Sequence, residues 1–210
     1  PNALAALGMT QLALQQLNAA QETLRALSAA AGQNVARLLR AAQYQSLARA
    51  PLDAAETLER ARSIAPDNPG ILRALAEARL GAGQSGAAET SARALLALPA
   101  PPAESWGLLG EILMAGGRPA EAAAVYAGGH ARYPRSAYAV AIWRAHAAAG
   151  DARRGLPALE AWWQAHPADP DARAALAIAW PQIGEWTKAQ TLYESLAAAR
   201  PGEPMILNNL

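Results

Sequence analysis

Similar patterns of apolar and small residues recur along the chain every 33 to 35 residues. The segment AAETLERARSIAP at residues 54–66 is followed by the related segment AAETSARALLALP at residues 87–99. Later segments of this kind end at Pro134, Pro167 and Pro201. Because Pro cannot continue a helix, the pattern predicts a helix that stops at the same point in each copy.

A second helical stretch, closed by Gly or another small turn residue, precedes each of these segments. The two stretches together predict a hairpin of antiparallel helices. Small residues such as Gly110 and Ala122 let the helices approach each other, and Trp106 and Tyr126 are expected to fill the space between them. One hairpin cannot bury its apolar face alone, so neighbouring hairpins are expected to stack.

The clearest copy of the pattern is the run of residues 103–134. In order, it carries Trp106, Leu109-Gly110, Leu113, Gly117, Ala122, Tyr126, Gly129 and Pro134. This order resembles the tetratricopeptide repeat, with Leu113 where the family usually has Tyr and Gly129 where it usually has Ala. The resemblance extends over the whole chain and implies an all-α fold, a right-handed α-solenoid of antiparallel helix hairpins.

The same register divides the chain into six repeats and the start of a seventh. The expected repeats are 1–34, 35–68, 69–102, 103–135, 136–169 and 170–203, with 204–210 opening the seventh. We interpret the sequence as an excised fragment, because it begins at Pro1 and ends inside an expected helix start.

Two repeats depart from the pattern. In the fifth, Trp143 stands where a small residue is usual, and Pro157 enters the first turns of the second helix. In the sixth, Trp180-Pro181 lies near the end of the first helix, where Pro kinks or ends a helix. These residues put ordinary helix packing in doubt there. Either these repeats are degenerate and accommodated by a local shift, or they form a hinge.

The composition agrees with a foldable helical chain. It is 52% hydrophobic and 17% charged, and its most frequent residue is Ala, the strongest helix former. The preference for Arg over Lys, which occurs only as Lys188, suggests a GC-rich bacterial coding sequence. The absence of Cys excludes disulfides, thiol chemistry and Cys-based zinc sites, and it leaves the compartment open.

Charge and hydropathy bear on the partners. A net charge of +1 gives no reason to expect a nucleic acid, since nucleic-acid binders usually carry a clear basic excess. No stretch reaches the about 18 apolar residues that span a bilayer, so we expect no direct membrane insertion by this segment.

The candidate chemistry is sparse. His130, His146 and His166 fall in different helices or links, and no metal or catalytic motif surrounds them. His130 and His166 precede helix-ending prolines, where a cation suits the helix C-terminus. We therefore expect a protein that is not an enzyme, with no catalytic residues, no metal ligands and no cofactor.

The resemblance places function on a surface. In tetratricopeptide arrays the first helices of the hairpins line a concave groove, where a peptide segment of a partner usually lies. Carried over by position, the groove candidates are Met9, Arg37, Arg40, Tyr44, Arg73, Glu77, Glu111, Met114 and Arg144. Arg37, Arg40 and Arg73 would form a basic cluster beside Tyr44, and Arg and Tyr often anchor interfaces. The alternative is a set of solvated charges, each exposed pair contributing about 0–1 kcal/mol.

Trp162 and Trp163 are adjacent, so they cannot both face one core. One is expected to pack inside its hairpin, and the other is expected to be partly exposed. The exposed ring either covers the interface with the next repeat or anchors a partner or oligomer contact.

The expected function is a non-catalytic scaffold that binds a protein or peptide segment. The Ala/Arg-rich repeats and the ILNNL sequence at 206–210 resemble large bacterial tetratricopeptide proteins of exopolysaccharide synthesis and export, which implies a periplasmic or cell-envelope scaffold. The alternatives are a cytoplasmic adaptor or regulatory protein, an accessory segment of a larger enzyme such as a glycosyltransferase, and a self-associating spacer.

Overall fold

The computed structural model describes residues 2–199, with side chains through Glu194, and the regular elements in this part of the chain are α-helices. The chain divides into two compact units, residues 1–116 and residues 117–210. The expected start of a seventh repeat at 204–210 lies outside the described residues.

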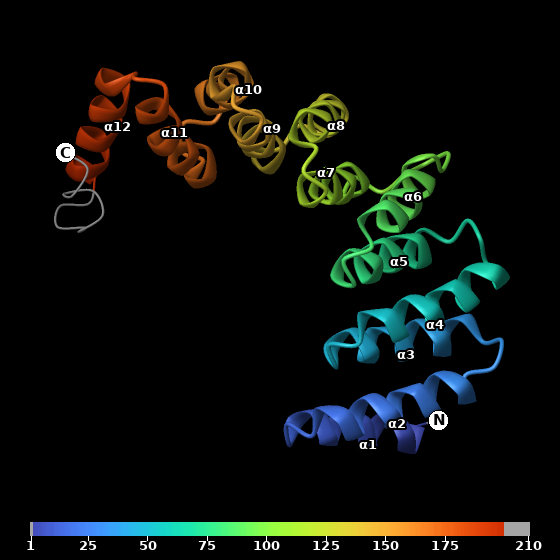
Figure 1. The fold of residues 1–210 in the computed structure, drawn as a ribbon. Coiled ribbons are helices and arrows are strands. Elements are labelled where there is room, and N and C mark those ends of the chain that lie inside the picture. The colour runs from blue at the N-terminus through green and yellow to red at the C-terminus, as the bar shows by residue number, and fades with distance from the viewer. Residues whose placement is uncertain (1, 200–210) are drawn as a thin grey trace. The chain divides into compact units, whose positions relative to one another are not determined.

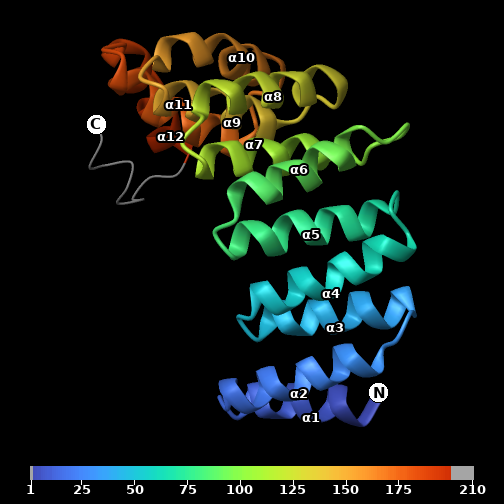
Figure 2. The same ribbon diagram turned by 45° about the vertical axis from the view of Figure 1, so that its right-hand side comes forward.

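The first unit is a succession of antiparallel helices (Figure 1). Its helices are α1 (Asn2–Ala13), α2 (Leu17–Ala30), α3 (Val35–Leu47), α4 (Pro51–Ile64), α5 (Pro69–Gly81), α6 (Ser85–Leu96) and α7 (Ser105–Ala115). Figure 2 shows the pairs α1–α2, α3–α4 and α5–α6 stacked one on the next. The prediction of an all-α array of stacked helix hairpins is therefore confirmed.

Asn and Pro residues stand at the N-terminal ends of several of these helices. The Asn34 side chain accepts a hydrogen bond from the Arg37 backbone N–H (3.0 Å) at the start of α3, and Asn68 does the same for Ile71 (3.1 Å) at the start of α5. Pro51 occupies the first position of α4, where its missing N–H leaves no hydrogen bond unmade. Asn and Pro thus fix where each helix begins.

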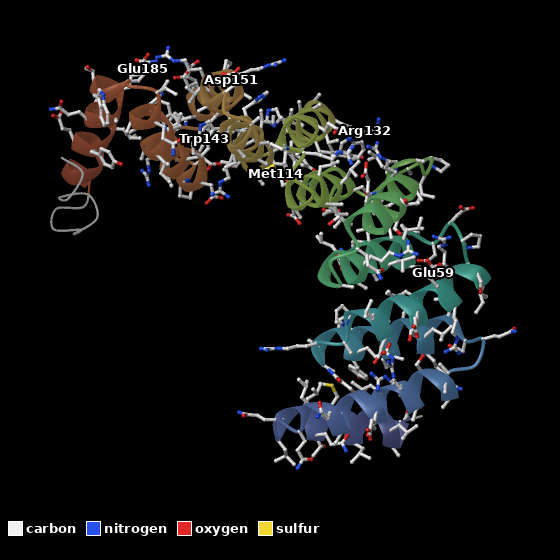
Figure 3. The ribbon with its side chains drawn as sticks, in the orientation of Figure 1. Glu59, Met114, Arg132, Trp143, Asp151 and Glu185 are labelled. Carbon is white, nitrogen blue, oxygen red and sulfur yellow. The ribbon has the colours of Figure 1, made fainter. Side chains whose placement is uncertain are left out.

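Alanine and leucine fill the core of the first unit. Leu24, Leu27, Ala41 and Ala48 form one buried cluster, and Leu58 and Leu75 belong to the next, together with several alanines. Polar contacts join the same helices. Arg79 of α5 forms an ion pair with Glu59 of α4, and Figure 3 labels Glu59. Arg79 also donates a hydrogen bond to the Ser91 hydroxyl of α6 (2.7 Å).

A small polar network is buried where α2, α3 and α4 meet. The Thr57 hydroxyl donates to Gln45 Oε1 (2.8 Å) and lies 2.8 Å from the Ser28 hydroxyl. Arg60 donates to the Ser28 hydroxyl from the rim (3.1 Å). Ser28, Gln45 and Thr57 are at most 5% exposed, so their polar atoms depend on protein partners for hydrogen bonds.

One position in the turn between the two helices of each hairpin has a left-handed backbone. It is occupied by Gly83, Gly117, Gly150 and Gly184 in the later hairpins. The first two hairpins place Gln15 (φ 60°) and Arg49 (φ 54°) there. Glycine adopts this conformation readily, whereas other residues adopt it at a cost.

The second unit continues the same architecture (Figure 1). Its helices are α8 (Pro119–Arg132), α9 (Ser136–Ala148), α10 (Ala152–Ala165), α11 (Pro170–Gln182) and α12 (Trp186–Ala199). Its core contains Trp143, Leu159, Leu176 and Trp180, all at most 4% exposed. Trp143, labelled in Figure 3, lies on α9.

The two helices of the fifth repeat, α9 and α10, pack against each other. Trp143 is buried, and α10 approaches its backbone closely because Gly155 supplies the small residue. α10 continues past Pro157, which is exposed, and α11 ends at Gln182, directly after Pro181. A hinge at these positions stays a hypothesis. Trp106 was expected in the core, but it is half-buried. Tyr126 is buried, as expected.

Candidate functional site

A cavity of about 960 Å³ lies between α3 and α5 in the first unit. The residues of α3 that line it include Ala36, Leu39, Arg40 and Gln43, and those of α5 include Gly70, Arg73, Ala74 and Glu77. These positions recur at intervals of three and four, so they lie on one face of each helix. The cavity therefore lies between the facing sides of α3 and α5, which are the first helices of two successive hairpins.

Small residues leave the space open. Ala36, Ala74 and Ala78 line the cavity with short side chains, and Pro51 of α4 contributes apolar surface above the buried Leu58. Longer polar side chains stand among them, chiefly Arg40, Gln43, Arg49, Arg73 and Glu77. The site thus combines an apolar lining with a few charged groups, as peptide-binding and ligand-binding sites commonly do.

The cavity has an excess of positive charge. Arg73 is paired with Glu77 on the next turn of α5, with 3.5 Å between Arg73 Nε and Glu77 Oε1. Arg40 and Arg49 are exposed and have no ion pair with any described residue. Two guanidinium groups at this cavity are therefore available to an anionic group.

A smaller cavity of about 270 Å³ lies on the other side of α3, against α1. Asn2 and Ala5 of α1 line it, together with Arg37 and Arg40 of α3. Ala36 and Arg40 line both cavities, so the two are neighbours along α3. We call the two cavities together the α1/α3/α5 groove.

The structure brings some of the predicted groove residues together and separates others. Arg37, Arg40, Arg73 and Glu77 line the α1/α3/α5 groove. The other candidates do not line it: Met9 is exposed on α1, Tyr44 is half-buried on α3, Glu111 is exposed and Met114 half-buried on α7, and Arg144 is exposed on α9. Tyr44 packs against the cluster around Leu24, because its ring is largely apolar. A binding role for each candidate stays a prediction.

Arg49 is a groove residue that the sequence analysis missed. It lies in the turn between α3 and α4, outside the helix face on which the candidates were sought. The register contained a signal, because the corresponding turn positions in later repeats are glycines such as Gly83 and Gly150.

Trp162 and Trp163 are both half-buried in the second unit. Trp162 donates from its indole nitrogen to Asp169 Oδ2 (3.0 Å) and stacks on His166, with 4.0 Å between ring centroids. Trp163 packs edge to face against Trp180 at 5.8 Å. Both rings have contacts inside this unit, and an anchor role for either stays a prediction.

The Asp169 carboxylate joins three helices of the second unit. Its Oδ1 accepts hydrogen bonds from the Ser136 hydroxyl (2.9 Å) and from the backbone N–H of Ala172 (2.9 Å). Partial burial raises the pKa of Asp169, but the hydrogen bonds from Ala172, Trp162, Ser136 and Asp171 outweigh it and lower this pKa below its ordinary value.

The described residues also bear on metal binding and on membrane insertion. Between residues 2 and 194, no group of three or more His, Cys, Asp or Glu side chains is placed to hold a metal ion. None of the helices described is both long and apolar enough to span a bilayer.

Comparisons with known proteins agree with this architecture. Residues 146–208 match the sequence profile of the family described as tetratricopeptide repeat. No curated protein sequence matches the chain. Among solved structures, MamA is similar with a TM-score of 0.61 and 17% identity, covering 78% of this chain and 90% of MamA.

Two other solved structures give the same result. YrrB, described as a tetratricopeptide protein with an unusual peptide-binding site, has a TM-score of 0.61 and 13% identity over 87% of this chain and 96% of YrrB. PilF of Pseudomonas aeruginosa has a TM-score of 0.61 and 13% identity over 99% of this chain and 95% of PilF. The profile match over residues 146–208 and these structural likenesses show that the chain has a fold similar to that of tetratricopeptide repeat proteins.

Proposed function

We propose that this protein is a non-catalytic scaffold that binds a segment of a partner protein in the α1/α3/α5 groove. The observation that carries the proposal is the cavity of about 960 Å³ between α3 and α5, where Arg40 and Arg49 have no ion pair with any described residue. The tetratricopeptide fold in general serves protein–protein interaction, and its members are usually non-catalytic scaffolds.

The shape of the site supports a chain segment as the ligand. The cavity between α3 and α5 and the one between α1 and α3 share Ala36 and Arg40, so a segment crossing α3 would contact both. Apolar surface from Leu39 and Pro51 is available to side chains of the partner. The polar side chains at the rim can fix its orientation.

One similar structure supports the same kind of ligand. YrrB is described as having an unusual peptide-binding site. At 13% identity this likeness concerns the fold, so the binding residues proposed here are argued from this chain alone.

Blocking the groove tests the proposal. Ala36 is exposed and lines both cavities, so Ala36→Trp would fill the groove without placing the new ring in the core. Ala94→Trp is the matched control, because Ala94 is exposed on α6 and lines neither cavity. Peptides selected from a random library on the unsubstituted protein should lose binding to Ala36→Trp and keep it with Ala94→Trp. Equal binding to both variants would refute a groove site.

We also propose a pathway, the synthesis or export of exopolysaccharide in a bacterial cell envelope. Its support is the resemblance of the Ala/Arg-rich repeats to large bacterial proteins of that kind. Fractionation of native cells tests it: recovery of the whole protein with the envelope is expected, and recovery with the cytosol alone would favour an adaptor there.

A further inference from the structure

We infer that the occupant of the α1/α3/α5 groove is an acidic protein segment, and that Arg49 and Arg40 bind its carboxylates. This inference rests on the proposed groove function and adds the chemistry of the partner. It also assigns a binding role to Arg49.

The backbone of Arg49 is the first observation. Its φ of 54° lies in the left-handed region, and the corresponding turn positions of the later hairpins are glycines. A left-handed residue commonly ends a helix, and Gln15 adopts the same conformation in the first hairpin, so the side chain and not the backbone distinguishes Arg49. The conformation places an arginine side chain at the cavity between α3 and α5, a contribution that a glycine in this turn would not make.

The charge of the cavity is the second observation. Arg73 has a carboxylate partner in Glu77, whereas Arg40 and Arg49 have none among the described residues. A guanidinium group donates two parallel hydrogen bonds to a carboxylate, and charge-assisted bonds of this kind are the stronger ones. The complementary ligand is therefore a segment that carries Asp or Glu.

A protein segment fits this cavity better than a nucleic acid. Proteins that bind single strands combine basic grooves with aromatic rings on which bases stack. The described lining of this cavity contains no aromatic side chain on which a base could stack. The chain as a whole has a net charge of only +1.

Fluorescence anisotropy with labelled peptides tests the inference on the whole chain, at about 150 mM salt so that distant charges are screened. The probes are a short Glu/Ala peptide, its Gln/Ala counterpart of equal length and a single-stranded oligonucleotide. We expect the Glu/Ala peptide to bind at least about tenfold more tightly than the Gln/Ala peptide. Arg49→Gly and Arg40→Gln should each weaken binding of the Glu/Ala peptide by about tenfold or more.

Two variants are matched controls. Gln15→Gly makes the same backbone change as Arg49→Gly at the corresponding turn of the first hairpin, outside both cavities. Arg93→Gln removes one positive charge from α6, also outside the groove. Both should bind the Glu/Ala peptide as the unsubstituted protein does.

The outcomes separate this inference from the proposed function. Equal binding of the Glu/Ala and Gln/Ala peptides, or unchanged binding by Arg49→Gly and Arg40→Gln, would overturn the inference of an acidic partner. The proposed groove function would still be supported if the library-selected peptides lose binding to Ala36→Trp. Tighter binding of the oligonucleotide that is lost in Arg49→Gly would overturn it in favour of a nucleic acid. If Ala36→Trp reduces the binding of none of the selected peptides, the proposed groove function itself is wrong.

Discussion

Gly155 of α10 lies directly against the backbone of Trp143 of α9. A Cβ atom at position 155 would stand 2.5 Å from Trp143 Cα and 3.2 Å from the Ile142 carbonyl oxygen. In the first hairpin the small residue is on the first helix instead, where Gly8 faces Leu24. The helices α9 and α10 thus approach each other closely, as α1 and α2 do. The small residue lies on the second helix and the large residue on the first, the reverse of the first hairpin.

Gly155→Ala should therefore destabilise the second unit. The added methyl group meets backbone atoms, which cannot move aside as a flexible side chain can. Overpacking of this kind costs about 1–3 kcal/mol, more than the gain from the higher helix propensity of Ala. Thermal unfolding followed by circular dichroism measures the effect.

Gly86→Ala is the control for Gly155→Ala. Gly86 lies in α6, and a Cβ there would meet nothing within 4 Å. This change should be neutral or stabilise by up to about 1 kcal/mol. If Gly155→Ala were as well tolerated as Gly86→Ala, the close contact with Trp143 would not exist.

Arg49→Gly should stabilise the first unit. The left-handed conformation at φ 54° costs a residue with a side chain about 1–2 kcal/mol, and the greater freedom of an unfolded glycine offsets part of the gain. We expect a net stabilisation of about 0.5–1 kcal/mol in chemical unfolding. A loss of stability would mean that Arg49 has a structural role and would weaken the case for a binding role.

Thr57→Val should destabilise the first unit by about 1–3 kcal/mol, because the buried Gln45 and Ser28 side chains each lose a hydrogen-bond partner. Thr90→Val is the control, since Thr90 is exposed and donates only to the Gly86 carbonyl of its own helix. Urea unfolding of both variants checks this. Equal, small effects would contradict the network.

The lowered pKa of Asp169 predicts how the second unit responds to acid. Because the folded-state pKa lies below the unfolded one, the carboxylate stabilises the fold above about pH 4, and this contribution is lost as the pH falls through the folded pKa. Asp169→Asn should reduce the loss of thermal stability between neutral and acidic pH. Trp fluorescence suits the measurement, because Trp162 lies beside Asp169.

Asp67→Asn controls for the removal of one negative charge, since Asp67 is exposed in the first unit. It should leave the acid response of the second unit unchanged. An identical acid response of Asp169→Asn and the unsubstituted protein would show that the Asp169 hydrogen bonds do not stabilise the fold.

The helix hairpins could be predicted from the sequence because the prolines and small residues recur in register. Pro134 and Pro167, for example, follow the ends of α8 and α10 closely. The packing of Trp143 could not be predicted, because its compensating residue is Gly155 on the partner helix. A repeat register describes which residue type each position usually holds. An exchange of the small and the large residue between two helices is seen only when the packing of the helices is known.

The groove could be predicted in part. The register placed Arg40, Arg73 and Glu77 on first helices, and all three line one cavity. It could not show that Tyr44 turns towards the core, because an aromatic ring can cover either apolar residues or a partner. Arg49 could not be predicted from the helix register, because it lies in the turn between α3 and α4.

Charge reversal of the groove tests the central claim most directly. The variant carries Arg37→Glu, Arg40→Glu and Arg73→Glu, and its control carries Arg62→Glu, Arg93→Glu and Arg154→Glu, none of which lines the groove. Isothermal titration with a groove-selected peptide measures binding, and circular dichroism checks folding. The account predicts that both variants fold and that only the groove variant loses the peptide. Undiminished binding by the groove variant would contradict it.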